Sequence, residues 1–273
     1  MSLLWRNHVR IGLCPDRLIV AGQRKGLLPG RRSEQSHRDI LALDSMDGAS
    51  PWRAAVEALP GALEMAGGEK PEVTVVLSNH FARYLLLPWN AQLKTEAEWE
   101  SLARHRLSSV YGSNAEDWLL QSSQTAHEGP RVVCAADRAM VEALGDQVTA
   151  CGAVLASVQP YLMAAFNRVR SLIGQRSCWL VLEERGRLTL ALFGQGGWHA
   201  IRSRRADERW QAQLPEILQR EEALLGVEAP CTEAFVYSEA EIESWSDGQY
   251  SFVDLTLPAG ATADERRFAM ALA

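Results

Sequence analysis

The sequence has no long apolar run. Although 47% of its 273 residues are hydrophobic, apolar segments such as residues 73–77 and 85–89 are only as long as a β-strand. A helix that crosses a bilayer needs about 20 such residues. Residues 1–10 also lack the hydrophobic stretch of a signal peptide. We therefore expect the protein to stay in the cytoplasm and to reach a membrane only through a partner that tethers it.

Motifs for metal, redox and hydrolytic chemistry are also missing. The six histidines are isolated and form no HExxH pair, so we predict no metal site. There is neither a GxSxG nucleophile elbow nor a glycine-rich P-loop. No two cysteines form a CxxC pair. We expect the thiols to be reduced and mostly buried as small apolar side chains; they belong to Cys14, Cys134, Cys151, Cys178 and Cys231.

The net charge of −6 shows no basic surplus, which argues against a dedicated nucleic-acid binder. The charge is unevenly distributed, because residues 1–38 hold eight basic and two acidic residues, a net charge of +6, which leaves −12 for the rest. This basic segment could face anionic lipid, or it could be a solvated strand edge protected by charge. Its basic residues are Arg6, Arg10, Arg17, Arg24, Lys25, Arg31, Arg32 and Arg38.

The first half of the chain reads as strands followed by alternating helices and strands. Residues 8–13 and 17–26 predict two strands joined at Pro15 and Asp16, which are typical turn residues. Thr95 and Glu98 predict a capping box at the start of a helix that ends at Gly112. The remaining predicted elements are a loop at 27–37, strands at 39–43, 72–77, 81–88, 118–125, 131–136 and 153–158, and helices at 51–65, 138–150 and 161–173.

The second half repeats the order of elements. We predict strands at 178–183, 188–193 and 198–202, a helix capped by Asp207 that ends near 225, a strand at 234–237, a short helix at 239–246, a strand at 251–255 and a last helix from Ala263. Both halves read β-β-β-α-β-α-β, which is the topology of the actin, hexokinase and Hsp70 superfamily. We therefore predict an α/β, actin-like (ribonuclease-H-like) fold. Lobe one would span 1–174 with inserted strands, and lobe two, 175–273, could be truncated at its C-terminus.

Several short motifs follow one another between residues 70 and 225. They are Ser78, Phe81, Arg83, Leu87 and Pro88 after a predicted strand, followed in order by Val110-Tyr111-Gly112, Trp118, Ala135-Ala136-Asp137-Arg138 and Gln159-Pro160-Tyr161-Leu162. This series resembles PilM/MshI-type pilus proteins and GspL-type secretion proteins, in which a strand, an S-x-x-F-x-R turn and an L-P ending recur. Each motif is weak alone, and the resemblance depends on their order.

The resemblance implies a cytoplasmic scaffold for type IV pilus (MSHA-type) assembly, peripheral to the inner membrane. PilM-like proteins bind the cytoplasmic tail of a PilN-like inner-membrane partner. GspL-like proteins carry their own membrane anchor and bind the secretion ATPase. The alternatives are therefore the cytoplasmic domain of a GspL-like protein, a platform that also binds the assembly ATPase, or an active actin-like ATPase.

Two hairpins bear on enzyme activity, because actin-like ATPases hold phosphate with an Asp-Gly hairpin in each lobe. The first hairpin has no aspartate before Gly12, and Pro15 lacks a backbone N–H donor. The second has Glu183, Glu184 and Gly186 where the family would show an Asp-x-Gly sequence. Glu184 could hold Mg²⁺ through water, but two adjacent carboxylates would repel a phosphate. We therefore predict no enzyme and no required cofactor, with residual Mg-ATP binding as the alternative.

Large aromatic residues at strand or loop ends are candidate partner anchors, because they bury much area with few rotatable bonds. Trp89, Trp198 and Trp245 occupy such places, and ordinary packing is the competing interpretation. We predict Arg83, Tyr84 and Trp89 as partner-binding residues. Four further tryptophans lie on apolar faces and are expected in the core: Trp52, Trp99, Trp179 and Trp210.

Overall fold

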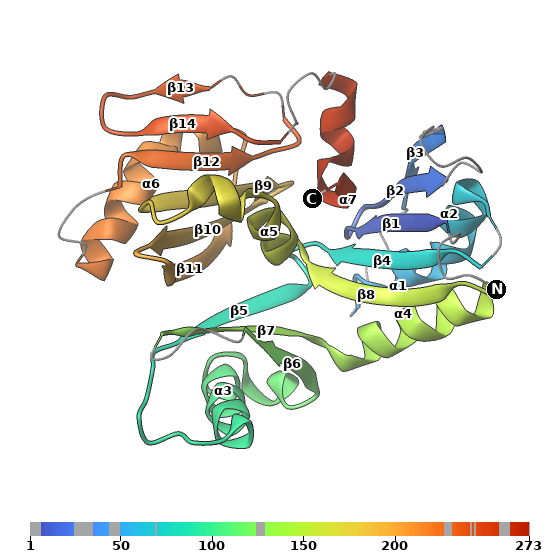
Figure 1. Cartoon of the computed structure of the whole chain (residues 1–273), viewed down its shortest axis with the longest axis horizontal. Helices are drawn as coiled ribbons and strands as arrows, with labels where there is room; N and C mark the ends of the chain where they lie inside the picture. Colours follow the sequence, from blue (N-terminus) through green and yellow to red (C-terminus); the bar gives the residue numbers. More distant parts are fainter. Residues whose placement is uncertain are drawn as a thin grey trace. The chain divides into compact units, whose positions relative to one another are not determined.

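The computed structural model describes residues 7–24, 35–43, 50–68, 70–123, 129–226, 231–240, 242, 244–256 and 263–272. The chain divides into two compact units (Figure 1). Unit 1 contains Met1–Ala82, Ala136–Ala164 and Met270–Ala273, and unit 2 contains Arg83–Ala135 and Ala165–Ala269. Each unit is assembled from separate stretches of chain. The predicted boundary between two lobes at residue 174 divides the chain in another way, and it stays a prediction.

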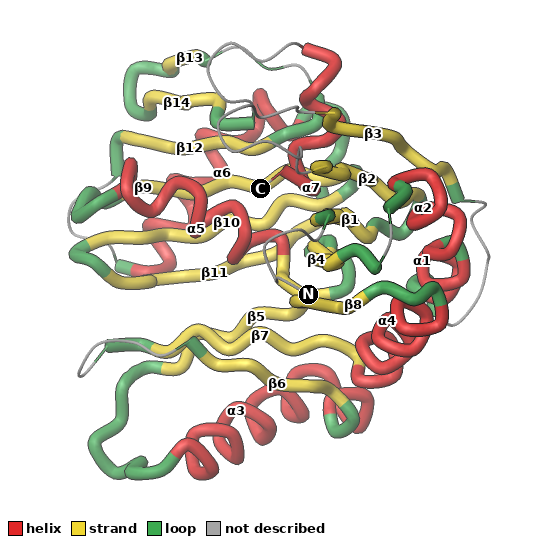
Figure 2. The backbone as a smooth tube through the Cα atoms, turned by 45° about the vertical axis from the view of Figure 1, so that its right-hand side comes forward, coloured by secondary structure: helices red, strands yellow, loops and turns green. Residues whose placement is uncertain are grey.

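Unit 1 is a five-stranded sheet covered by helices on one face. The strand order is β3-β2-β1-β4-β8, with β1 (His8–Leu13), β2 (Arg17–Arg24), β3 (Gln35–Ala42), β4 (Glu72–Leu77) and β8 (Val154–Pro160). The first three strands are antiparallel, and β4 and β8 run parallel to β1 and β4 respectively. Figure 2 shows α1 (Arg53–Glu57), α2 (Leu59–Ala66) and α4 (Arg138–Ala150) side by side. Their apolar side chains share one core with β1, β2 and β4.

Unit 2 contains a six-stranded sheet with a helix on each face. The order is β11-β10-β9-β12-β14-β13, with β9 (Cys178–Glu184), β10 (Arg187–Gly194), β11 (Gly197–Arg205), β12 (Glu233–Tyr237), β13 (Trp245–Ser246) and β14 (Ser251–Asp254). Helix α6 (Trp210–Leu225) shares a core with one face. On the opposite face, Phe166 of α5 (Tyr161–Ile173) contacts the rings of Phe193 and Trp198 at centroid distances of 5.3 and 4.4 Å.

A smaller layer of unit 2 consists of three strands and one long helix. The strand order is β5-β7-β6, with β5 (Ala82–Leu87), β6 (Trp118–Ser122) and β7 (Arg131–Asp137). Helix α3 (Glu96–Tyr111) packs on the sheet through Trp99, Ala103 and Leu107, and the short helix η2 (Gly112–Ala115) follows it. The predicted capping box is present, because Glu98 N donates to Thr95 Oγ1 and Thr95 N donates to Glu98 Oε2.

Several predicted boundaries were wrong. The third strand begins at Gln35 rather than at residue 39, because it pairs with β2 along that strand's full length as far as Arg24. The predicted helix at 51–65 is two helices, with α1 and α2 separated at Ala58. The predicted cap Asp207 lies in a turn before α6, whose N-cap position is Arg209 and carries no side-chain cap.

The predicted helix at 239–246 is absent from the described part of that range, where Trp245 and Ser246 form β13. Tertiary contacts favour the strand, since the Trp245 ring stacks on Phe252 at 4.2 Å and the Asp254 N–H donates to Ser244 Oγ. The chain ends in the 3₁₀ helix η3 (Ala263–Phe268) and α7 (Ala269–Leu272), where the last helix was expected.

The predicted burial of tryptophans and cysteines is mostly confirmed. Trp99, Trp179 and Trp210 are buried, while Trp52 is half-buried. Cys14, Cys178 and Cys231 are buried and Cys134 is intermediate, but Cys151 is exposed because it lies in the turn after α4. All five are free thiols.

Candidate functional site

The first predicted phosphate hairpin, β1–β2 in unit 1, is covered by the C-terminal helix. A Cβ atom added to Gly12 would lie 3.2 Å from Ile19 Cβ and 3.4 Å from Met270 Cγ. The Met270 thioether also accepts a hydrogen bond of 3.4 Å from Cys14 Sγ. Met270 is 1% exposed, and Arg10 Nε donates to the carbonyl oxygen of Ala271 at 2.6 Å. The space over Gly12 is therefore filled by α7.

The turn of this hairpin uses its own backbone donors. The N–H of Cys14 donates to the carbonyl oxygen of Arg17 at 3.0 Å, and Pro15 has no N–H. The Arg17 guanidinium is buried and pairs with Asp16 at 2.7 Å. This turn therefore does not present the set of free N–H groups that binds a phosphate.

The second predicted hairpin, β9–β10 in unit 2, also lacks a phosphate cradle. Glu183 accepts a hydrogen bond of 2.7 Å from Ser238 Oγ, and Glu184 is 6% exposed. As neighbours on one strand, the two carboxylates point to opposite faces of the sheet. Gly186 has a φ of 76°, which suits the tight turn between the strands, and its carbonyl accepts from the Ala206 N–H.

Taken separately, each hairpin has a residue considered for nucleotide binding in contact with another part of its own unit. Gly12 faces Met270 rather than open space, and Glu183 is engaged by Ser238. Within the described ranges there is no group of three or more His, Cys, Asp or Glu side chains placed to hold a metal ion. In the same ranges no helix is long and apolar enough to cross a membrane.

The three predicted partner residues do not form one patch. Arg83 and Tyr84 are neighbours on β5, so their side chains leave opposite faces of the sheet. Trp89 lies two residues beyond the other end of β5 and is 45% exposed. Their roles stay predictions, and only Trp89 offers a large exposed apolar surface among the three.

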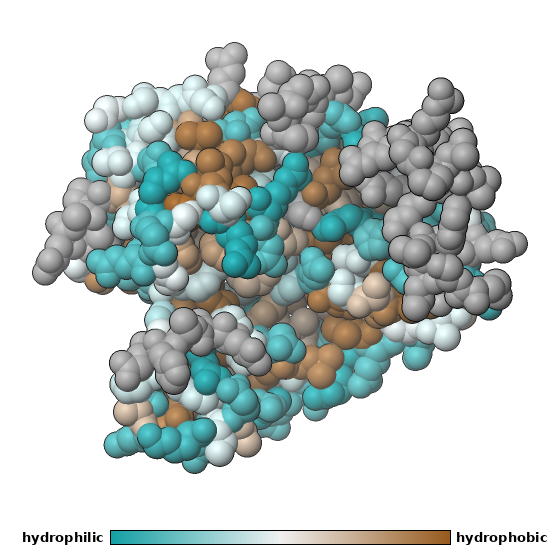
Figure 3. All heavy atoms as spheres, viewed as in Figure 1, coloured by the Kyte–Doolittle hydropathy of each residue, from teal (hydrophilic) through white to brown (hydrophobic). Residues whose placement is uncertain are grey.

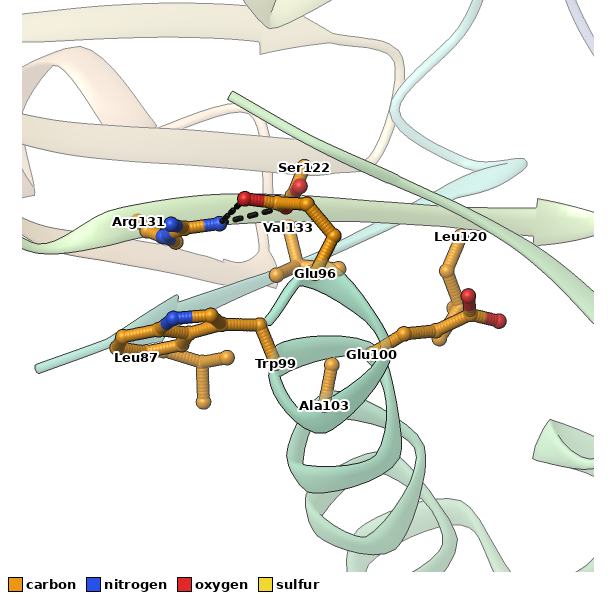
Figure 4. A pocket seen from close by; sticks show the side chains of 9 residues that line it. All are labelled: Leu87, Glu96, Trp99, Glu100, Ala103, Leu120, Ser122, Arg131 and Val133. Atoms are coloured by element: carbon orange, nitrogen blue, oxygen red, sulfur yellow. Dashed lines mark hydrogen bonds and ion pairs between the residues drawn. The ribbon is translucent and has the colours of Figure 1, made fainter. Parts of the chain in front are cut away.

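A pocket of about 130 Å³ opens between α3 and the three-stranded sheet (Figure 4). Its floor is apolar and its rim is charged or polar. The apolar lining comprises Leu87, Trp99, Ala103, Leu120 and Val133, and the polar lining comprises Glu96, Glu100, Ser122 and Arg131. Leu87, which lines the pocket, is the last residue of β5, and Trp89 follows it two residues later in the sequence.

One ion pair defines the rim of this pocket. Arg131 Nη1 donates to both carboxylate oxygens of Glu96, at 2.8 and 2.7 Å. Its guanidinium carbon lies 4.5 Å from the centroid of the Trp99 ring, which adds a cation–π contact (Figure 4). The arginine therefore holds an indole ring and a carboxylate in a defined position at the pocket mouth.

Sequence reasoning found part of this pocket. The helical pattern predicted one inward face for α3 made of Trp99, Leu102, Ala103, Val110 and Tyr111. Trp99 and Ala103 are buried as predicted, but the prediction was wrong for Val110 and Tyr111, which are 71% and 40% exposed. It missed the pairing of Arg131 with Glu96, because 35 residues separate them and only the sheet and helix bring them together. In Figure 3, the visible surface at the lower left, where Figure 1 draws α3 and its sheet, is mostly hydrophilic with small hydrophobic patches.

Comparisons with known proteins show the fold. No protein-family model and no curated protein matches the sequence. A Bacteroides thetaiotaomicron protein with an actin-like ATPase fold and unknown function matches with a TM-score of 0.62 and 11% identity, over 98% of this chain and 96% of that chain. The PilM–PilN type IV pilus biogenesis complex matches with a TM-score of 0.61 and 14% identity, over 97% and 96%.

A third similar structure is the cytoplasmic domain of EpsL, an inner-membrane component of the type II secretion system of Vibrio cholerae. Its TM-score is 0.57 at 12% identity, over 97% of this chain and 94% of that chain. The predicted resemblance to PilM and to GspL-type proteins is thus confirmed at the level of the fold. The chain has the actin-like ATPase fold along nearly its whole length.

Proposed function

We propose that this chain is a non-catalytic cytoplasmic platform of a type IV pilus (MSHA-type) assembly system. The observation that carries the proposal is the first hairpin, where no aspartate precedes Gly12 and Met270 packs against this glycine. A platform does not require a phosphate-binding hairpin. The likeness to the PilM–PilN complex supports the assignment to a pilus system.

The partner we propose is the cytoplasmic tail of a PilN-like inner-membrane protein, which would place the platform at the inner membrane. The pocket beside α3 and the exposed Trp89 support a peptide-binding role for this layer. An apolar floor accepts an aliphatic or aromatic side chain of a peptide, and a charged rim orients its polar groups. Indole rings at such positions contribute strongly to binding.

The experiment is calorimetric titration of the full chain with a synthetic peptide of the cytoplasmic tail of a PilN-like inner-membrane protein from the same organism. We expect saturable binding, weakened about tenfold or more by Trp89→Ala. Leu172→Ala is the matched control, since Leu172 is 47% exposed on α5 and outside this layer. If Trp89→Ala binds the peptide as tightly as the unaltered chain, the docking surface does not lie on this layer. If the peptide does not bind the unaltered chain, the proposed partner is wrong.

A second candidate is the cytoplasmic domain of a GspL-like secretion protein. The observation that favours it is the likeness to the cytoplasmic domain of EpsL, which covers 97% of this chain. This candidate would bind the secretion ATPase rather than a pilus tail, and a platform could also bind a pilus assembly ATPase. Co-purification of the full chain with each ATPase distinguishes these partners from the tail peptide.

A further inference from the structure

Residues 263–272, named the C-terminal segment, have buried side chains in both units. The segment consists of η3 and α7, which follow each other without a break. Residues up to Ala269 belong to unit 2, and Met270 begins the part that belongs to unit 1. Phe268, Ala269 and Met270 are each at most 5% exposed. The segment therefore packs like a core element although it is short.

In unit 2 a buried ion pair holds the C-terminal segment. Arg266 is 8% exposed, and its Nη2 donates to Asp254 Oδ2. Its Nη1 donates to the carbonyl oxygen of Ser238 at 3.3 Å. Ser238 follows β12 and Asp254 ends β14, so Arg266 lies at the carboxyl ends of two parallel strands. Ligands of open α/β sheets usually bind at this end, and here the guanidinium of the chain itself occupies it.

In unit 1 the C-terminal segment covers the first hairpin. Met270 lies against Gly12, and its thioether accepts the hydrogen bond from Cys14 Sγ, in a thiol that is 4% exposed. A thiol is a weak donor and a thioether a weak acceptor. The stronger polar contact is that of Arg10 Nε with the carbonyl oxygen of Ala271. The burial of the Cys14 thiol therefore depends on α7 staying in place.

The ion pair of Arg266 is incompletely satisfied. Its Nε atom is buried and has no hydrogen-bond partner in the described part of the chain. A buried donor without an acceptor lowers the stability of the closed arrangement. A buried ion pair also loses the hydration of both charges, which opposes the attraction between them. Asp254 and Arg266 regain water when the segment leaves, so these effects favour local opening while the two units stay folded.

We propose that the C-terminal segment is a releasable cover of the first hairpin and that the Arg266–Asp254 ion pair holds it closed. Because η3 and α7 are continuous, loss of the ion pair in unit 2 also frees Met270 farther along the same segment. Release uncovers Gly12 and Cys14 in unit 1. A molecule that binds only the open arrangement shifts the equilibrium toward it. The proposal does not involve the pocket beside α3 and holds whether or not the tail peptide binds there.

The competing explanation is that the C-terminal segment is a permanent part of both cores, as its buried side chains also allow. In that case the segment leaves only when the units themselves unfold. The two explanations differ in whether the Cys14 thiol becomes reactive while the rest of the protein stays folded.

The test uses the cysteines of the full chain as reporters, with N-ethylmaleimide as the reagent and mass spectrometry to follow each thiol. Cys151 is exposed and should react at once, whereas Cys178 and Cys231 are buried in unit 2 and should react only when that unit unfolds. We expect Cys14 to react between these limits. Arg266→Gln should increase the Cys14 rate about tenfold or more, because the Asp254 carboxylate then loses its charged partner in the closed arrangement.

Arg267→Gln is the matched control, because Arg267 is the next residue, carries the same charge and is exposed. It should leave the Cys14 rate unchanged. Hydrogen exchange of the β4 amides, measured in parallel, shows whether unit 1 stays folded. The proposal is overturned if Arg266→Gln and Arg267→Gln give the same Cys14 rate, or if Cys14 reacts only when the β4 amides also exchange.

Hydrogen exchange of the unaltered chain decides the question if Arg266→Gln does not fold. Amides of α7 that exchange well before those of β4 and β9 support the releasable cover. Exchange of α7 together with these strands overturns it, since the segment then opens only on unfolding.

Discussion

At the scale of single residues, Glu222 is a buried polar group with three hydrogen-bond partners in the core of unit 2. It is 5% exposed on α6. Its Oε1 accepts hydrogen bonds from Trp179 Nε1 at 2.8 Å and from the Cys231 N–H at 3.2 Å, while Oε2 accepts from the Tyr250 hydroxyl at 3.0 Å. One carboxyl group therefore joins α6 to β9 and to the segments before β12 and β14.

Removing this carboxyl group should strongly destabilise the protein. Glu222→Ala leaves three buried donors without an acceptor, so we expect the free energy of unfolding to fall by about 3–5 kcal/mol. Glu222→Gln keeps one acceptor oxygen and should lower the free energy of unfolding by less than Glu222→Ala does. Urea denaturation followed by tryptophan fluorescence measures both.

The neighbouring Glu221 provides the control. Its contact with Arg202 at 3.6 Å lies near the surface, so Glu221→Ala should change the free energy of unfolding by at most about 1 kcal/mol. An equal decrease in the free energy of unfolding for Glu221→Ala and Glu222→Ala would contradict a special role for the hydrogen bonds of Glu222.

At the scale of elements, α3 begins where its sequence specifies. The carboxylate of Glu98 accepts hydrogen bonds from the N–H groups of Lys94 and Thr95, at 2.6 and 2.8 Å. These bonds hold the pKa of Glu98 below its ordinary value. The capping box is made of residues within four positions of one another, which is why the sequence alone could predict it.

Thr95→Ala should lower the free energy of unfolding by about 1 kcal/mol, because the Glu98 N–H loses its acceptor at the start of the helix. Ser101→Ala in the exposed middle of the same helix should cost nothing, since alanine is the better helix former. Thermal unfolding monitored by circular dichroism gives both values. An unchanged stability in Thr95→Ala would show that tertiary packing alone determines where α3 begins.

At the scale of the whole molecule, the actin-like ATPase fold occurs here with two hairpins that lack the expected Asp-Gly residues. We expect calorimetry to detect no ATP binding to the full chain, with or without Mg²⁺, because Met270 covers Gly12 and Glu183 is held by Ser238. Micromolar binding that is lost in Glu183→Ala or Glu184→Ala would contradict this expectation and favour an active ATPase. A known ATPase of the same fold serves as the positive control.

The sequence predicted those elements whose signals lie close together along the chain. The α3 capping box and the β1–β2 turn at Pro15 are of this kind, and both are present in the structure. The helix predicted at 239–246 failed because its preference was weak and Trp245 gains more by stacking on Phe252. The three predicted partner residues were chosen because they lie in the part of the chain that holds the matching motifs, which does not reveal that Arg83 and Tyr84 leave opposite faces of β5.

The two hairpins show which features the sequence determined and which only the tertiary structure decided. The sequence by itself determined that no aspartate precedes Gly12 and that Glu183 and Glu184 stand in the second hairpin, because these are statements about neighbouring residues. Only the tertiary structure decided that Met270 fills the space over Gly12 and that Arg205 lies opposite Arg187. Such contacts depend on strand register and on packing between distant segments, which local sequence preferences do not specify.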